Sequence, residues 1–366
     1  MSTALSGPAA DLGRQMRAGL LAAFAERNVQ GGWQGRELRL TALDDGYEPK
    51  LTVPNMRALV ADAELLAVVG NVGTPTAVAA LPIARRAQIP FIGAFSGAGV
   101  LRKQPPEPLV LNYRASYAEE TAAMVEALLN FGGCRPEEIA FFTQRDAFGD
   151  AGFHGGLAAL RAHGLSEGFW VAHGRYERNT EAVENGLADI LLAPVTPKAV
   201  ILVGTYAPCA RFIRLARESG LQAHFLNVSF VGANSLSRAL GSQGNGVIVT
   251  QVVPHYRSQI PAVQAYRSAM KRHQPDQALG FVSLEGYLVG RLLIAGLENH
   301  SEAEITRKQL VVALESLGKF DLGLGIPLCL SAKDHQACHE IWPTVLSNGQ
   351  VEPMDWQDLQ DRDFHE

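Results

Sequence analysis

The sequence predicts an α/β protein built from two doubly wound, Rossmann-like lobes. Short apolar runs alternate with amphipathic helices along most of the 366 residues, a pattern typical of a mostly parallel sheet covered by helices. The pattern runs through once and restarts after the segment 108–116. A chain of this length also exceeds what one hydrophobic core usually organises, so two lobes are expected.

Each expected element follows from its own local pattern. In the first part we expect a short strand at 2–5, a helix starting near Asp11, and then strand and helix in alternation at 37–45, 49–63, 65–70, 75–88 and 90–95. In the second part we expect helices at 117–132, 149–164, 180–193 and 208–220, with strands at 138–144, 168–176, 199–205 and 223–230. Two more helices, 262–274 and 282–299, precede a β-meander over 327–354.

Composition excludes several classes of protein. Hydrophobic residues make up 47% of the chain and charged residues 19%, which favours a folded protein over a disordered one. The net charge of −5 includes no basic block, so a nucleic-acid partner is not expected. No apolar run has the length of a membrane span, so the protein is not expected to be membrane-embedded.

Four loops that follow expected strands are unusually small and polar. They lie at 5–13, 70–78, 93–99 and 204–209. In doubly wound sheets ligands bind at the carboxyl ends of the strands, where loop amides and helix N-termini point outward. Small residues let a ligand approach those amides closely, so these loops are the first candidates for a binding site.

The sequence offers little support for catalysis, a cofactor or a metal. Asp44 and Asp45 are adjacent at a strand end and therefore point to opposite sides, so we expect them to cap a loop. His335 and His339 lie near Cys338, but a hairpin is a poor frame for a metal site without more ligands. There is no GxSxG, no P-loop lysine and no GxGxxG linked to a strand.

The four cysteines are Cys134, Cys209, Cys329 and Cys338, and none lies in a CxxC pair. Cys329 and Cys338 flank a short polar turn, where a hairpin would bring them together. Two interpretations follow: a disulfide in an oxidising compartment, or two half-buried thiols on neighbouring strands.

Several motifs, in this order, resemble the leucine/isoleucine/valine-binding branch of the type I periplasmic solute-binding proteins. These motifs are "LSGPAADLG", "GGWQGR" and "DDGYEP" near the start, "VVGNVGTPTAV" and "IGAFSGAG" next, and "LVGTYAPCARFIRLARESGL" and "SLEGYLVGRLLIAGL" later. The resemblance covers nearly the whole chain. It implies a type I periplasmic binding fold, in which a three-crossing hinge joins the lobes and a ligand is clamped by hinge closure.

The resemblance also implies lobe boundaries and site residues. The N-terminal lobe is expected at 1–116 plus 254–328, and the C-terminal lobe at 117–253 plus 329–366. Gly73, Thr74 and Thr76 are expected to hold an α-carboxylate. The Phe95 carbonyl and the Ser96 and Gly97 amides are expected to meet the ligand's ammonium. From the second lobe, the expected ligand contacts are Phe148, Tyr206 and Ser229; Glu285 is expected to face the cleft.

Each of these assignments has a plainer alternative. Thr74 and Ser96 are also suited to capping the helices that follow them, and aromatics such as Phe148 and Tyr206, each close behind a strand, are often core residues. Ser229 occupies a position where amino-acid binders of this family commonly have a carboxylate. The loss of that carboxylate argues against an amino-acid ligand unless Glu285 replaces it.

The leading hypothesis is the substrate-binding component of an ABC importer that captures an amino acid or a related small carboxylate or amide. It is not an enzyme, it needs no cofactor, and its partner is an ABC permease. The alternatives are a ligand-sensing domain of a receptor or regulator, and an α/β enzyme of unassigned reaction.

The family resemblance implies a periplasmic location, whereas residues 1–5 carry no signal peptide and by themselves favour the cytoplasm. The family also has a full buried strand before "ALSGP". We therefore expect the given start to lack a leading strand, and residues added upstream to improve solubility and melting temperature.

Overall fold

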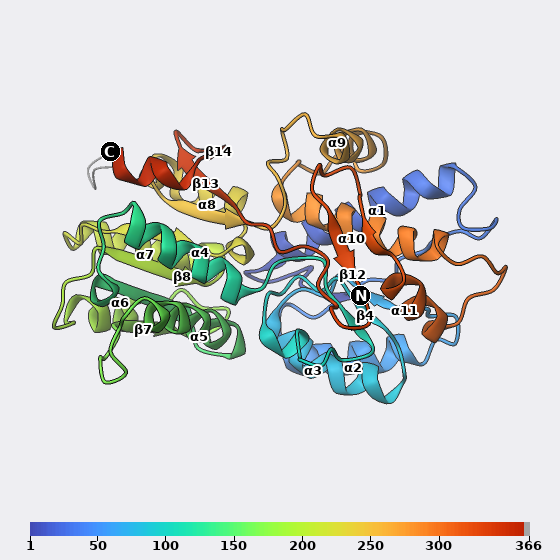
Figure 1. Cartoon of the computed structure of the whole chain (residues 1–366), viewed down its shortest axis with the longest axis horizontal. Coiled ribbons are helices and arrows are strands. Elements are labelled where there is room, and N and C mark those ends of the chain that lie inside the picture. The colour runs from blue at the N-terminus through green and yellow to red at the C-terminus, as the bar shows by residue number, and fades with distance from the viewer. Residues whose placement is uncertain (362–366) are drawn as a thin grey trace. The chain divides into compact units, whose positions relative to one another are not determined.

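The computed structural model describes residues 1–361 and divides them into two compact α/β units (Figure 1). The first unit contains residues 1–115 and 253–340, and the second contains 116–252 and 341 onward. The chain therefore passes between the units three times. Two of these passages fall within one residue of the expected boundaries, and the third falls after residue 340 instead of 328.

The first unit contains two parallel sheets, one antiparallel pair and six α-helices among the described residues. Its strands are β1 (Ser2–Thr3), β2 (Leu43–Asp44), β3 (Val68–Val69), β4 (Phe91–Ile92), β5 (Val110–Leu111), β11 (Gly318–Phe320) and β12 (Leu328–Leu330). Its helices are α1 (Ala10–Val29), α2 (Pro49–Val60), α3 (Thr74–Arg86), α9 (Pro261–His273), α10 (Phe281–Glu298), α11 (Arg307–Glu315) and the 3₁₀ turn η1 (Gly99–Leu101).

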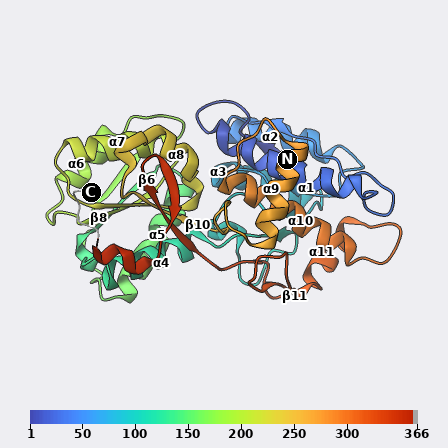
Figure 2. The ribbon, with the colours of Figure 1, turned by 90° about the horizontal axis from the view of Figure 1, so that it is seen from above.

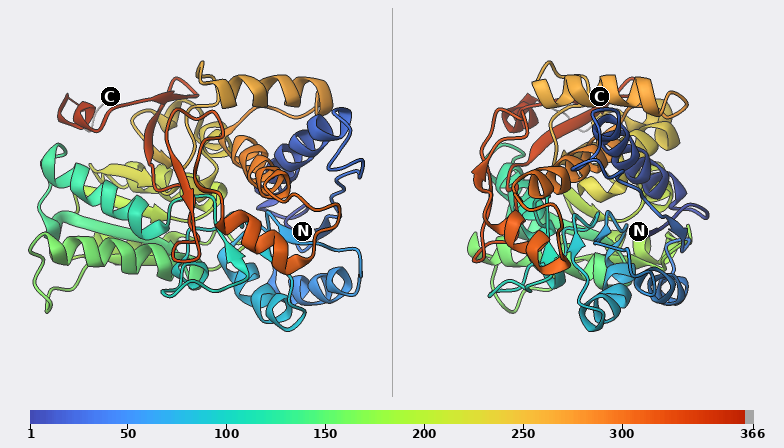
Figure 3. Two further views of the ribbon diagram at one scale, coloured as in Figure 1. Left: turned by 45° about the vertical axis from the view of Figure 1, so that its right-hand side comes forward. Right: turned by 90° about the vertical axis from the view of Figure 1, so that its right-hand side faces the viewer.

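Helices cover the parallel strands β3, β4 and β5 of the first unit. Apolar residues of α2 and α3, such as Met56 and Leu81, form a core with Phe91 and Val110 of the strands. Helices α1 and α10 lie side by side (Figure 1), and α9 runs next to α1 (Figure 3). The loops that follow β3, β4 and β5 therefore emerge together at the carboxyl edge of one sheet.

The second unit is built on one seven-stranded sheet with the order β14-β13-β10-β9-β8-β6-β7. Its strands are β6 (Ile139–Gln144), β7 (His173–Tyr176), β8 (Ala199–Val203), β9 (His224–Asn227), β10 (Ile248–Gln251), β13 (Trp342–Ser347) and β14 (Gln350–Pro353). Its α-helices are α4 (Tyr117–Asn130), α5 (Ala147–Ala162), α6 (Glu184–Leu191), α7 (Tyr206–Glu218) and α8 (Ala233–Leu240). The 3₁₀ turns are η2 (Pro136–Glu138), η3 (Ser229–Val231), η4 (Gly241–Gly244) and η5 (Trp356–Asp361).

This larger sheet is doubly wound. Helices α4 and α5 lie together on one face, while α6, α7 and α8 gather on the other (Figure 2). Strands β6 and β8 are buried along their whole length, as the continuous apolar runs predict. The α/β fold with two lobes is thus confirmed.

The C-terminal meander expected over 327–354 is wrong in one respect. β13 and β14 form an antiparallel hairpin in the second unit, but β12 pairs with β11 in the first unit. The segment after β12 also bonds to the end of β5, because Asn112 N–H donates to His335 O at 2.7 Å and Cys338 N–H donates to Tyr113 O at 2.8 Å. These backbone bonds hold residues 329–340 in the first unit.

The expected strand over 37–45 is reduced to Leu43–Asp44. Its parallel partner β1 spans only two residues, so the ladder has only two pairs. The strands expected at 65–70 and 90–95 shorten in the same way to β3 and β4.

Candidate functional site

Asp44 and Asp45 hold the first polar loop in place. Asp44 Oδ1 accepts hydrogen bonds from the amides of Leu5, Ser6 and Gly46. Asp45 is buried and accepts from the hydroxyls of Ser2 and Thr52 and from the amide of Tyr47. Burial raises the pKa of Asp45, while the bonds to Asp44 outweigh its burial and lower its pKa. The predicted loop-capping role is confirmed.

The loops after β3 and β4 pair with each other as the sequence predicts. Gly73 N–H donates to Phe95 O at 3.1 Å, and Phe95 N–H donates to Asn71 O at 2.8 Å. The hydroxyls of Thr74 and Ser96 lie 2.8 Å apart, and both residues are fully buried. Since one hydroxyl must donate to the other, the pair keeps one proton to give to a further acceptor.

Some of the expected donors and acceptors are already used inside these loops. Ser96 N–H donates to Ala94 O, and the Phe95 carbonyl accepts from Gly73. The Thr76 hydroxyl donates to Val72 O at 2.6 Å. A tight turn therefore takes the Ser96 amide, whereas the Phe95 carbonyl, which accepts one bond, keeps a second lone pair. That these two groups meet a ligand's ammonium stays a prediction.

Three backbone donors remain available at this edge. The amides of Thr74 and Thr76 lie in the first turn of α3, where a helix leaves N–H groups without internal partners. Neither they nor the buried Gly97 N–H has a hydrogen-bond partner within residues 1–361. The N-cap of α3 is Gly73, without a side-chain cap, so the capping alternative for Thr74 is not supported.

A buried arginine lies against the second of these loops. The Arg114 guanidinium carbon is 4.8 Å from the centre of the Phe95 ring, and Arg114 Nη1 is 3.7 Å from Glu285 Oε1. Both side chains are buried. The two loops hold no lysine or arginine of their own. Arg114 reaches them from "LNYRAS", shortly after β5, and the sequence analysis did not identify it; its place behind a strand was the available signal.

Tyr113 precedes this arginine and is also buried. Burial, followed by the nearby Cys338 and Glu285, raises its pKa well above the ordinary value. The phenol carries its hydrogen at neutral pH, as an unperturbed tyrosine also does.

In the second unit, Ser229 binds a carboxylate that the sequence analysis did not identify. Glu120 of α4 accepts from Ser229 N–H at 2.7 Å, from Ser229 Oγ at 2.9 Å and from Thr250 Oγ1 at 2.6 Å. Glu120 is fully buried. A carboxylate is thus present beside Ser229, although Ser229 itself has none.

The aromatic residues expected in the second unit lie in different surroundings. Phe148 is fully buried between Tyr117 and Phe230, with ring centroids at 5.1 and 4.5 Å. Tyr206 is half-buried and is the first residue of α7. Phe230 follows Ser229 directly, which places Phe148 and Ser229 in one neighbourhood.

The structure does not form the disulfide considered for Cys329 and Cys338. Cys329 is a half-buried thiol, and its amide donates to Ala337 O at 3.1 Å. Leu328 and Leu330 point into the core, so Cys329 between them faces the other side of β12. Cys338 is buried beside Tyr113. The two thiols therefore have different environments although their backbones are close.

The two histidines considered as metal ligands have protein partners. His335 Nδ1 lies 2.8 Å from Val110 O and its Nε2 lies 2.9 Å from Glu315 Oε1. His339 Nδ1 lies 2.8 Å from Gln336 Nε2. Within residues 1–361 no group of three or more His, Cys, Asp or Glu side chains is placed to hold a metal ion.

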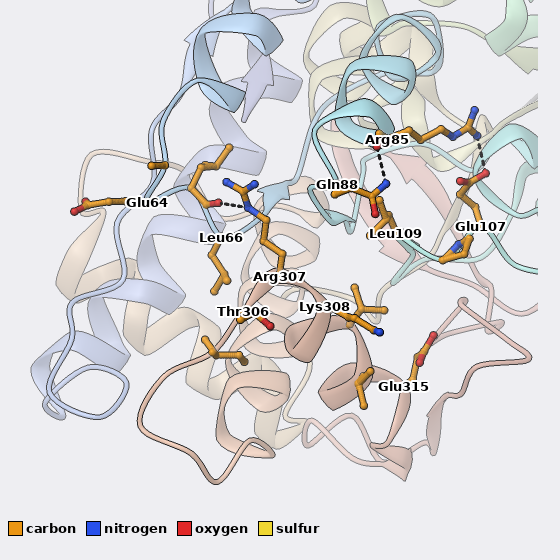
Figure 4. Close-up of a pocket in the computed structure, with 16 residues that line it drawn as sticks. Glu64, Leu66, Arg85, Gln88, Glu107, Leu109, Thr306, Arg307, Lys308 and Glu315 are labelled. Atoms are coloured by element: carbon orange, nitrogen blue, oxygen red, sulfur yellow. Dashed lines mark hydrogen bonds and ion pairs between the residues drawn. The ribbon is translucent and has the colours of Figure 1, made fainter.

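A pocket of about 910 Å³ opens elsewhere on the first unit (Figure 4). It lies where β3, β4 and β5 begin, between the loop 63–66 and α11. Arg307 Nε donates to Leu65 O at 2.9 Å, and Arg85 pairs with Glu107 at 2.8 Å. The pocket is therefore at the opposite edge of the sheet from the predicted loops.

Comparisons with known proteins identify the class. A family model described as periplasmic binding protein matches residues 1–350, so the chain belongs to the periplasmic binding protein family, a family of solute-binding proteins. Among the described residues, no helix has both the length and the apolar character needed to cross a membrane.

Individual relatives and solved structures show which members of the family this chain is similar to. A solved structure described as a possible leucine/isoleucine/valine-binding protein from Rhodopirellula baltica SH 1 is 54% identical, with a TM-score of 0.95, over 98% of this chain and 96% of that one. The Leu/Ile/Val-binding protein of Escherichia coli K12 is 27% identical over 83% of this chain and 80% of its own length. A substrate-binding periplasmic protein from Ralstonia solanacearum is 28% identical, with a TM-score of 0.85, over 96% of this chain and 98% of that one.

Proposed function

We propose that this protein is the substrate-binding component of an ABC importer for amino acids, works in the periplasm and delivers its ligand to a permease. Family membership and the likeness to leucine/isoleucine/valine-binding proteins support the proposal. The observation that carries it is the set of buried donors that β3 and β4 bring together.

The ligand's carboxylate is proposed to bind at the N-terminus of α3. The Thr74 and Thr76 amides, the Gly97 amide and the remaining hydroxyl proton of Thr74 and Ser96 supply its hydrogen bonds. The positive end of the helix dipole adds to these bonds. Gly73, at the N-cap, has φ of 104°, which favours glycine. Thr76 contributes its amide, because its hydroxyl is used within the turn.

Further contacts are proposed for the ligand's ammonium and side chain. Glu285 is near Arg114, which offsets part of its charge. Glu120, held beside Ser229, is the carboxylate proposed to attract the ammonium in place of the acidic residue that the sequence lacks at position 229. Phe148 and Tyr206 are proposed as apolar contacts.

The test begins with thermal-shift measurements against the twenty amino acids, small amides and aromatic acids. A ligand that binds only the folded state raises its melting temperature, so we expect leucine, isoleucine or valine to do so. No shift with any amino acid would contradict the proposal.

The site itself is tested by calorimetry on Thr74→Ala and Ser96→Ala with L-leucine. Losing the hydroxyl that donates to the ligand leaves a desolvated acceptor short of one donor, so the affinity of the variant that lacks it should fall about tenfold to a hundredfold, or roughly 1 to 3 kcal/mol. Thr180→Ala is the control, because that hydroxyl is exposed and donates to Glu177 O. Wild-type affinity in both site variants would place the ligand elsewhere.

A further inference from the structure

We propose that Arg102 is a positioning residue, which fixes the ligand loop 95–98 and ties it to two of the three segments where the chain passes between units. This inference rests on the proposed function, since it assumes that the Gly97 amide meets a ligand. Arg102 itself follows η1 and touches no ligand in the proposal.

The guanidinium of Arg102 donates the hydrogen bonds that join these segments. Arg102 Nη1 donates to Ser96 O at 3.0 Å and to Ala98 O at 3.2 Å. Its Nη2 donates to Arg114 O at 2.8 Å, and its Nε donates to Gln336 Oε1 at 2.6 Å. Three parts of the first unit that are far apart in sequence therefore meet on one side chain.

The bond to Ser96 O sets the direction of the ligand donor. In a trans peptide the carbonyl oxygen of one residue and the N–H of the next lie in one plane and point opposite ways. Because Ser96 O points toward Arg102, the Gly97 N–H points away from it. That N–H has no partner within residues 1–361, so Arg102 orients a buried donor that the loop does not use itself.

The bonds to Arg114 O and Gln336 Oε1 reach the segments that lead into passages between the units. Arg114 lies just before the first passage, and Gln336 lies shortly before the third. The two segments already run together, since Ala337 N–H donates to Asn112 O at 2.9 Å and Asn112 forms a parallel bridge with Gln336. Any shift of the ligand loop is thus transmitted through one planar group to both segments.

A lysine at position 102 should not make the hydrogen bonds that Arg102 makes. A guanidinium presents five N–H donors in a rigid planar fork, whereas an ammonium presents three from one point. Arg102→Lys keeps the positive charge but is not able to serve four acceptors spread over three segments.

The first experiment measures amide hydrogen exchange of the full ligand-free chain. In Arg102→Lys we expect exchange to rise about tenfold, equivalent to about 1.4 kcal/mol, in 96–99, 112–114 and 335–338 together, because the lost bonds lower the local stability of these segments. In Gln336→Leu only 112–114 and 335–338 should rise. The control Arg86→Lys alters an exposed arginine of α3 and should change nothing.

A uniform rise across the first unit in Arg102→Lys, or no rise at all, would overturn the inference whatever the protein binds. The helix α2 provides the internal reference, because the four bonds described above join Arg102 to other segments.

The second experiment is calorimetry with L-leucine as the probe. Arg102→Lys should bind about tenfold more weakly, while Gln336→Leu keeps the ligand loop in place and loses about twofold or less. Equal affinity of wild type and Arg102→Lys would contradict the positioning role. If wild type does not bind leucine or any other amino acid, the proposed function fails, and the exchange pattern still decides the structural part of the inference.

Discussion

Thr74 and Ser96 show how single residues acquire a role through their neighbours. Each hydroxyl lies in a loop after a different strand, and in sequence each is equally suited to cap a helix. The parallel pairing of β3 and β4 brings the two within 2.8 Å, where they share one proton and leave another available. Neither residue alone defines a site.

His173 gives the second unit a defined response to pH. Its Nε2 lies 2.7 Å from Thr143 Oγ1 and its ring stacks on Phe153 at 3.9 Å. Burial, helped by Arg175, lowers the pKa of His173 from 6.5 to about 4. The unfolded chain therefore binds a proton between these values and the folded one does not, so stability present above pH 6.5 is lost as pH falls toward 4.

We expect the free energy of unfolding of His173→Gln to fall less than that of wild type as the pH is lowered. Urea unfolding at pH 7 and pH 5 should show a smaller difference in the variant than in wild type, by on the order of 1 to 2 kcal/mol. His163, which is exposed on the surface, provides the control variant His163→Gln. An unchanged difference in His173→Gln would show that His173 is not responsible.

At the scale of elements, the contact between α1 and α10 depends on glycine. A Cβ at Gly19 would lie 2.0 Å from Ser283 O, and a Cβ at Gly286 would lie 2.4 Å from Met16 O. The two helix backbones therefore approach more closely than any side chain allows. This approach lets both helices cover the strands of the first unit.

Gly19→Ala should destabilise the protein by about 2 kcal/mol or more, since the clash is with backbone and not with a flexible side chain. Gly168→Ala is the matched control, because a Cβ there meets nothing within 4 Å, and its effect should be within about 0.5 kcal/mol. The melting temperatures of both variants test this. A Gly19→Ala protein as stable as wild type would mean that the helices separate at little cost.

At the scale of the whole molecule, the first unit is assembled from two separate parts of the chain. Residues 1–115 supply β1 to β5 and α1 to α3, while 253–340 supply α9, α10, α11 and the pair β11 and β12. Ala23 of α1 is buried and faces Gly290 of α10, and the backbone of Leu20 lies beside the same glycine. Without the later segment, the buried face of α1 is left in water.

A chain ending at residue 252 should therefore fail to fold its first unit. Limited proteolysis should cut within 1–115, whereas co-expression of 253–340 should restore protection, because it returns the apolar partner of α1. Resistance of 1–115 in the shortened chain would show that this segment forms a core without α10.

The sequence by itself determined the class of the fold, the order of most elements and the loops that carry the candidate site. Apolar runs and helical periodicity are local properties, so they survive without tertiary information. The "GTPT" and "AFSG" loops could be predicted as neighbours because parallel strands end at one edge of a sheet. The loop-capping role of Asp44 likewise followed from its place at a strand end.

Only the tertiary structure decided which hydrogen-bonding groups of the candidate site remain available to a ligand. The Ser96 amide and the Phe95 carbonyl are used by the loops themselves, while Arg114, Glu120 and Arg102 reach the candidate residues from other elements. These contacts join residues that are distant in sequence, and no local pattern encodes them. The same reason explains why residues 329–340 are expected in the second lobe but lie in the first unit. A strand of three residues carries no information about its partner, and the pairing of β12 with β11 and of Gln336 with Asn112 decides the outcome.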